Sequence, residues 1–175
     1  MSGDVLVAGI GNIFQGDDAF GVAVAQRLGC ISVPANVRVI DAGIRSLDLA
    51  FALMDEHALT ILVDATSRGG EPGTIYTIEV EPSDIPDVSE EGSVVNSHAL
   101  DPVRVLSLAK SMGARFGKTF VVGCEPLVVD CDATGKIGLS DPVQAAVVPA
   151  LETVLSLIEE FANRSSKDQE EVYSK

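Results

Sequence analysis

Apolar residues along the chain gather in short runs that are rich in valine and isoleucine and separated by glycines, prolines and acidic residues. Several runs are nearly continuous rather than alternating, which is typical of strands buried on both faces of a parallel sheet. Strands are therefore predicted at residues 4–10, 37–42, 59–65, 74–80 and 119–124.

Between most of these strands, apolar residues recur three and four positions apart, a spacing that predicts amphipathic helices. The helices are expected at residues 19–28, 47–57, 102–112 and 141–163. In the last of them, Asp141 and Pro142 are expected to serve as the N-cap and the first helical residue. Pro149 is expected to kink this helix or to end a short first piece of it.

The alternation of strands and helices predicts an α/β fold with three layers, a twisted and mostly parallel sheet of about five strands flanked by helices on both faces. The strand at 74–80 follows the third strand through a link too short for a helical crossover, so it is expected to be its antiparallel neighbour. The acidic segment 81–97 is expected to be an exposed loop. We expect a single domain over residues 1–163 and a disordered tail over 164–175.

The composition of the chain excludes some classes of binding partner. The chain has 12 lysines and arginines against 26 aspartates and glutamates, a formal charge of −14, which would repel nucleic acid and anionic membranes. No apolar run approaches the roughly 18 to 20 residues needed to span a bilayer, and the first residues lack the basic region of a signal peptide. A cytoplasmic protein is therefore expected. The three cysteines have no metal-ligand spacing and are expected to be reduced thiols.

Candidate chemistry lies after the strands, because ligands of open α/β sheets bind outside the carboxyl ends of the strands. Asp17 and Asp18 precede a predicted helix and could cap it, and Asp64 ends the third strand, where it could cap a turn. His98 lies in a predicted loop, where a histidine is commonly solvated, whereas His57 is expected at the negative end of a helix. Taken together, two of these carboxylates and the His98 imidazole would form an open site that suits zinc, nickel, cobalt or manganese.

The glycines after the first strand also suggest a dinucleotide-binding turn, but the pattern does not fit. Phe14 occupies the third glycine position, and Asp41 follows Gly11 by about 30 residues rather than the usual ~20. A tight turn in which Asn12 adopts an unusual backbone conformation explains Gly9 and Gly11 without a ligand.

Five ordered blocks carry a family resemblance. They read GIGNIFQGDDAFGVAVAQRL (9–28), DAGIRSLDLAF (41–51), LVDATSRGGEPGTIY (62–76), SHALDPVRVLSLAKSMG (97–113) and VVGCEP (121–126). In these blocks the sequence resembles the hydrogenase maturation proteases, which remove the C-terminal extension of the large subunit of nickel-iron hydrogenases. The first block, with its glycines, asparagine and paired acids, is the specific one. The chain departs from the family at residues 41–44, where DAGI replaces a common Asp-Gly-Gly-Thr turn, and at Ala19, where glycine is frequent.

The resemblance implies an endopeptidase with a phosphorylase- or hydrolase-like fold, and it places the catalytic and metal-contacting roles on Asp18, Asp64 and His98. It further implies that the metal is nickel already inserted in the large-subunit precursor, so that the protease holds no tightly bound metal of its own. Two other functions remain open: a chaperone that checks the nickel without cleaving, and a metallohydrolase with a resident metal. Second-rank contacts to the substrate are expected from Asp17, Asn12, Asp41 and Gly43.

Overall fold

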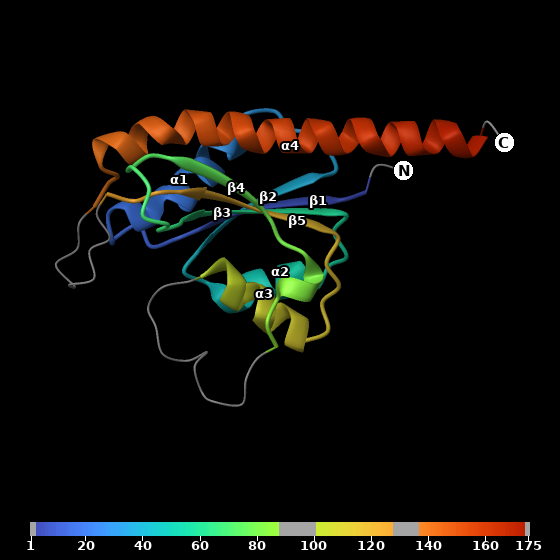
Figure 1. The fold of residues 1–175 in the computed structure, drawn as a ribbon, viewed down its shortest axis with the longest axis horizontal. Helices are drawn as coiled ribbons and strands as arrows, with labels where there is room; N and C mark the ends of the chain where they lie inside the picture. Colours follow the sequence, from blue (N-terminus) through green and yellow to red (C-terminus); the bar gives the residue numbers. More distant parts are fainter. Residues whose placement is uncertain (1–2, 88–100, 128–136, 174–175) are drawn as a thin grey trace.

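The computed structural model describes residues 3–87, 101–127 and 137–173, with the backbone alone from residue 165 onward. Its sheet contains five strands in the order β2-β1-β3-β5-β4, within a three-layer α/β arrangement (Figure 1). All five lie where the sequence predicts strands, and the predicted α/β fold is confirmed. The strands are β1 (Val5–Ile10), β2 (Val37–Gly43), β3 (Leu59–Ala65), β4 (Ile75–Glu79) and β5 (Lys118–Cys124).

Helices cover both faces of the sheet, as Figure 1 shows. Helices α1 (Phe20–Gly29) and α4 (Asp141–Tyr173) lie on one face, and α2 (Ser46–Leu53) and α3 (Pro102–Ser111) lie on the other. The short 3₁₀ helices η1 (Asp17–Ala19) and η2 (Pro82–Asp84) precede α1 and follow β4.

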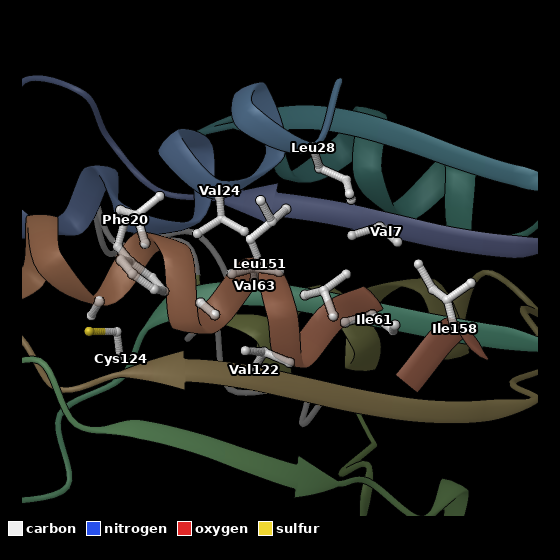
Figure 2. Close-up of a cluster of buried hydrophobic side chains, with 14 of the residues drawn as sticks. Val7, Phe20, Val24, Leu28, Ile61, Val63, Val122, Cys124, Leu151 and Ile158 are labelled. Atoms are coloured by element: carbon white, nitrogen blue, oxygen red, sulfur yellow. The ribbon is translucent and has the colours of Figure 1, made fainter. Parts of the chain in front are cut away.

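The sheet has an apolar core on each face because its inner strands bury successive residues on opposite sides. On one side, Val7, Ile61 and Val122 pack with Phe20 of α1 and Leu151 of α4 (Figure 2). The neighbouring positions on the same strands turn to the other side and meet α2 and α3. That second core includes Leu6, Leu62, Val121, Leu49 and Leu106.

The place of β4 in the sheet differs from the prediction. β4 is antiparallel, as expected, but its neighbour is β5 and not β3. β5 pairs with β3 over its whole length, so β4 takes the position at the edge. The connection at 66–74 is long enough for this arrangement. It has to pass only one strand, β5, which is a span of about 10 Å between strands two positions apart.

Three predictions concern helix α4. It is continuous through Pro149, which is exposed, so the proline does not end it. It begins at Asp141, so this residue is helical and is not the N-cap. It runs as far as Tyr173, so most of the segment 164–175, predicted as a disordered tail, is helical.

The other predicted segments agree in part. The helix expected at 47–57 ends at Leu53, and the ring of His57 is buried, with Nε2 2.9 Å from the carbonyl oxygen of Ala52 in the last turn of α2. The segment 81–97 is described only to residue 87. There Ile85 is buried, and its carbonyl accepts a hydrogen bond from Lys110 Nζ. Within the described ranges, no helix is long and apolar enough to cross a membrane.

Candidate functional site

The loop between β1 and α1 folds back on itself. Gly11 and Gly16 have positive φ angles of 135° and 62°, a conformation that side chains disfavour. A Cβ atom on Gly11 would overlap the backbone of Asp18, so the loop can close only around a glycine. The closed loop brings the backbone N–H of Asn12 to 2.6 Å from Asp18 Oδ2. The prediction that Asn12 adopts an unusual backbone conformation was wrong, because among the described residues only glycines have positive φ.

A close approach between helix and sheet then sets the position of Asp18. Added Cβ atoms on Gly9 of β1 and Gly21 of α1 would collide with backbone atoms: that on Gly9 with Gly21, and that on Gly21 with Ile10 and Val63. The first turn of α1 can therefore lie directly against the carboxyl ends of β1 and β3. This packing places Asp18, just before α1, beside the end of β3.

Asp64 is the penultimate residue of β3 and is only 5% exposed. Its Oδ1 atom is buried and has no hydrogen-bond partner among the described residues. Burial raises the pKa of Asp64 well above the ordinary value, and the negative charges of Asp18 and Asp101 raise it further, against a lowering by the N–H of Ala65. Burial likewise raises the pKa of Asp18, although the hydrogen bond from Asn12 opposes the change. Two carboxyl groups thus share one poorly hydrated site.

One oxygen of this pair, Asp64 Oδ1, lacks a hydrogen-bond donor among the described residues. A buried carboxylate oxygen without a donor is costly unless it is protonated or meets a cation. The residues therefore fit the binding of a metal ion. Among the described residues no three His, Cys, Asp or Glu side chains form a group that could hold a metal. His98, the third residue of the predicted set, lies outside the described residues, so the structure tests only the pairing of the two acids.

Asp17 has a different role from its neighbour. Its side chain is fully buried, and its carboxylate accepts hydrogen bonds from the backbone N–H of Leu127 and from both the N–H and the hydroxyl of Ser140. These bonds hold the loop after β5 and the residue before α4 against η1. The structure thus gives Asp17 an internal role, and its contact to the substrate stays a prediction. Neither Asp17 nor Asp18 caps α1, which has no side-chain cap.

The remaining second-rank residues lie at the end of β2, beside β1. Asp41 is exposed, and one carboxylate oxygen accepts a hydrogen bond from Gln26. Gly43 has a φ of 53°, and its carbonyl accepts the N–H of Gly11, which ties this turn to the loop that holds Asp18. Ala42, which stands in place of a common family glycine, buries its methyl group in the core under α2.

Glu125, which follows β5, is a site residue that was not predicted from the sequence. Its side chain is buried and accepts hydrogen bonds from the N–H groups of Arg68 and Gly69 and from the hydroxyl of Tyr76. Burial alone would raise its pKa, but these bonds, with one from the N–H of Gly70, lower the pKa to about 2. Glu125 therefore shapes the loop that follows Asp64. An acid directly after a buried strand, as in GCEP, was the signal that could have identified it.

The cysteines take no part in the site as described. Cys30 is exposed at the end of α1, and Cys124 is buried. Burial, followed by the charge of Asp17, raises the pKa of the Cys124 thiol to about 12, so it is not a ready nucleophile. Cys131 lies outside the described residues.

Comparison with known proteins shows which family this chain is similar to. The family model for hydrogenase maturation protease, HycI, matches residues 22–157. A putative hydrogenase maturation protease of Methanocaldococcus jannaschii is 33% identical over 156 residues, which cover 89% of this chain and 96% of that protein.

Solved structures give the same result. The hydrogenase maturating endopeptidase HybD from Escherichia coli superposes with a TM-score of 0.70 at 27% identity, covering 90% of this chain and 93% of its own. The hydrogenase 2 maturation peptidase of a Thaumarchaeota archaeon gives a TM-score of 0.66 at 30% identity, with coverages of 89% and 98%. This chain belongs to the hydrogenase maturation protease family, and it is a peptidase of that family.

Proposed function

We propose that this peptidase removes the C-terminal extension of a hydrogenase large-subunit precursor after nickel has been inserted, and that it recognises this nickel through Asp18, Asp64 and His98. The observation that carries the proposal is the buried Oδ1 atom of Asp64, which has no hydrogen-bond partner among the described residues and lies next to a second acid of raised pKa. A divalent cation would supply the missing partner for that oxygen.

The nickel is part of the substrate in this proposal. Two carboxylates and an imidazole would complete the coordination of a metal that the precursor already holds, and the peptide bond to be cut would thereby be fixed beside the acids. Both acids can accept a proton from the attacking water once they are ionised. A precursor without nickel would lack this anchor and would stay uncut.

Membership of the family supports the proposal, because the relatives and solved structures named above are themselves called hydrogenase maturation proteases or peptidases. The identity of the particular hydrogenase is a separate matter, since no described contact distinguishes one client from another. The DAGI turn beside β1 is a place where this chain differs from the common family pattern.

Incubation with nickel-loaded and nickel-free precursor, followed by intact-mass measurement, tests the proposal. The expected result is loss of the C-terminal extension from the nickel-loaded precursor alone. Binding of the loaded precursor without any change in mass would instead indicate a nickel-checking chaperone. Cleavage of both forms would remove nickel recognition from the mechanism.

Metal analysis of the purified protein separates a third case. A protease that engages the nickel of its substrate should be isolated almost free of metal, whereas a metallohydrolase should retain about one ion per chain. Retention of a stoichiometric ion, together with loss of activity on chelation, would replace the proposal with a resident-metal enzyme.

A further inference from the structure

Helix α2 has more apolar surface than its packing uses. Its sequence SLDLAFAL is apolar on almost every side, and Leu49, Ala50 and Leu53 are buried against the sheet. Leu47 and Phe51, one turn apart on the other side, remain 53% and 54% exposed. Asp48, which forms an exposed ion pair with Arg45, is the one charged residue of α2. Exposed apolar residues that lie together commonly mark an interaction site, and no described element covers Leu47 and Phe51 fully.

Exposed apolar residues also lie on the two segments between α2 and the paired acids Asp18 and Asp64. Ile44, just before α2, is 60% exposed and follows Gly43, whose carbonyl accepts the N–H of Gly11. On the loop that begins with Gly11, Ile13 and Phe14 are 48% and 58% exposed. Because β1 and β2 are neighbouring parallel strands, the residues that follow them emerge side by side, roughly 5 Å apart. We define the apolar face by the five residues Ile13, Phe14, Ile44, Leu47 and Phe51.

The end of the apolar face nearest the acids is held in a fixed geometry. Asn12 Oδ1 accepts the N–H of Phe14 at 3.0 Å, while the N–H of Asn12 bonds to Asp18 Oδ2 at 2.6 Å. Asn12 thus bonds both to the backbone of Phe14 and to a carboxylate of the site. Asn12 therefore links the segment that carries Phe14 to the carboxylate of Asp18.

We propose that the apolar face is the docking surface for an apolar segment of the hydrogenase large-subunit precursor, which it holds beside Asp18 and Asp64; this rests on the proposed function. A second copy of the chain fits less well, because covering Ile13 and Phe14 would bring it against the acids that the substrate must reach. The face contains no ionisable side chain, while the whole chain carries a charge of −14. The matching precursor segment is therefore apolar and flanked by basic residues.

The test compares two folded double variants with the wild type, using nickel-loaded precursor. Leu47→Ser/Phe51→Ser alters the apolar face and leaves the acids intact. Ile31→Ser/Val148→Ser is the matched control, because Ile31 lies beyond the end of α1 and Val148 lies on α4, and they are 40% and 42% exposed. Thermal unfolding verifies that each variant folds, and Phe14→Ser and Ile44→Ser replace the first variant if it does not.

The face variant should raise the KM for cleavage and the Kd for precursor about tenfold, with kcat unchanged, while the control matches the wild type. A KM and Kd within twofold of wild type would overturn the docking surface while leaving the protease function in place. Precursor binding that depends on the face but leads to no cleavage would uphold the surface and refute the protease function. Sedimentation tests the remaining occupant: a wild-type dimer that the face variant converts to monomer, with unchanged precursor binding, would assign the face to self-association.

Discussion

Two pairs of acids at the carboxyl edge of the sheet differ in how their oxygens are satisfied. Asp17 and Glu125 are buried and receive hydrogen bonds from several backbone and side-chain donors. Asp18 and Asp64 lie beside each other, and Asp64 Oδ1 has no partner among the described residues. The pKa of Glu125 is lowered to about 2, whereas the pKa values of Asp18 and Asp64 are raised.

The difference separates two uses of a buried carboxylate. Where donors surround it, as at Glu125, the charge is stabilised and the acid holds loops in place. Where burial outweighs the few donors, as at Asp64, whose Oδ1 has no partner among the described residues, the charged form is disfavoured and the group is available to an external proton or cation. Four acids that look alike in sequence are thus two structural anchors and two candidate reactive groups.

The largest expected effect comes from Asp64→Asn. Cleavage of nickel-loaded precursor should fall at least about 100-fold, because an amide is a weak, uncharged ligand and a poor base. Stability at pH 7 should not fall, and it should rise by about 1 kcal/mol, since the substitution removes a carboxylate whose charged form is disfavoured by burial. The sign follows from the raised pKa: this group stabilises the fold less as pH rises above the ordinary carboxyl value.

Intact-mass kinetics and urea unfolding measure these two effects, and Asp18→Asn is expected to show the same loss of cleavage. Asparagine caps helices as well as aspartate does, so a mere cap at position 18 would tolerate the change. Wild-type cleavage by either folded variant would break the distinction between the two pairs of acids.

His98→Ala tests the third predicted contact. We expect cleavage to fall about as far as in Asp64→Asn, with the free energy of unfolding unchanged within about 0.5 kcal/mol, because the sequence predicts a loop at His98 and a loop side chain contributes little to the core. Cleavage assays and urea unfolding on the same preparation provide both numbers. Full processing of loaded precursor by this variant would remove the imidazole from the mechanism.

Asp17→Asn should lower the free energy of unfolding more than it changes cleavage. The amide has one acceptor oxygen and would turn a donor toward the N–H and hydroxyl groups of Ser140. The free energy of unfolding should decrease by about 2–3 kcal/mol, while the folded fraction keeps its nickel selectivity. Denaturant unfolding monitored by circular dichroism checks the first expectation. Unchanged stability with lost cleavage would restore Asp17 to the substrate-contacting group.

Glu125→Gln tests the comparison of the two pairs of acids through the pH dependence of stability. Because the folded pKa of Glu125 is lowered to about 2, its stabilisation is fully present above about pH 4.5 and is lost as pH falls toward 2. The wild type should take up about one more proton on acid unfolding than the variant does. Unfolding curves collected between pH 2 and 6 measure this difference. Parallel pH profiles for the two proteins would show that Glu125 is not held ionised.

Cysteine replacement has the smallest expected effect. Cys30→Ser and Cys131→Ser should leave both cleavage and stability unchanged, and Cys124→Ala should retain cleavage while losing about 1 kcal/mol of stability from its buried position. Precursor cleavage by each purified variant is the measurement. A folded cysteine variant that no longer cuts would point to a thiol mechanism.

The sequence by itself determined the elements and the candidate acids. Continuous valine- and isoleucine-rich runs marked all five strands, and helical spacing marked α1 to α4, because burial imposes those periods directly on the residues. The position of Asp64 at a strand end and of Asp18 before a helix also followed from the local pattern. The pairing of β4 with β5 did not, since a nine-residue connection permits either neighbour.

Only the tertiary structure decided what each acid does. Asp17 and Asp18 are adjacent in sequence, yet the former faces Ser140, 123 positions away, and the latter faces Asn12 in its own loop. Glu125 likewise acquires its role from the turn after β3. A hydrogen bond between residues that are distant in sequence does not produce a periodic pattern of apolar and polar residues. Whether a buried carboxylate is an anchor or a reactive group is therefore set by the donors that folding brings to it.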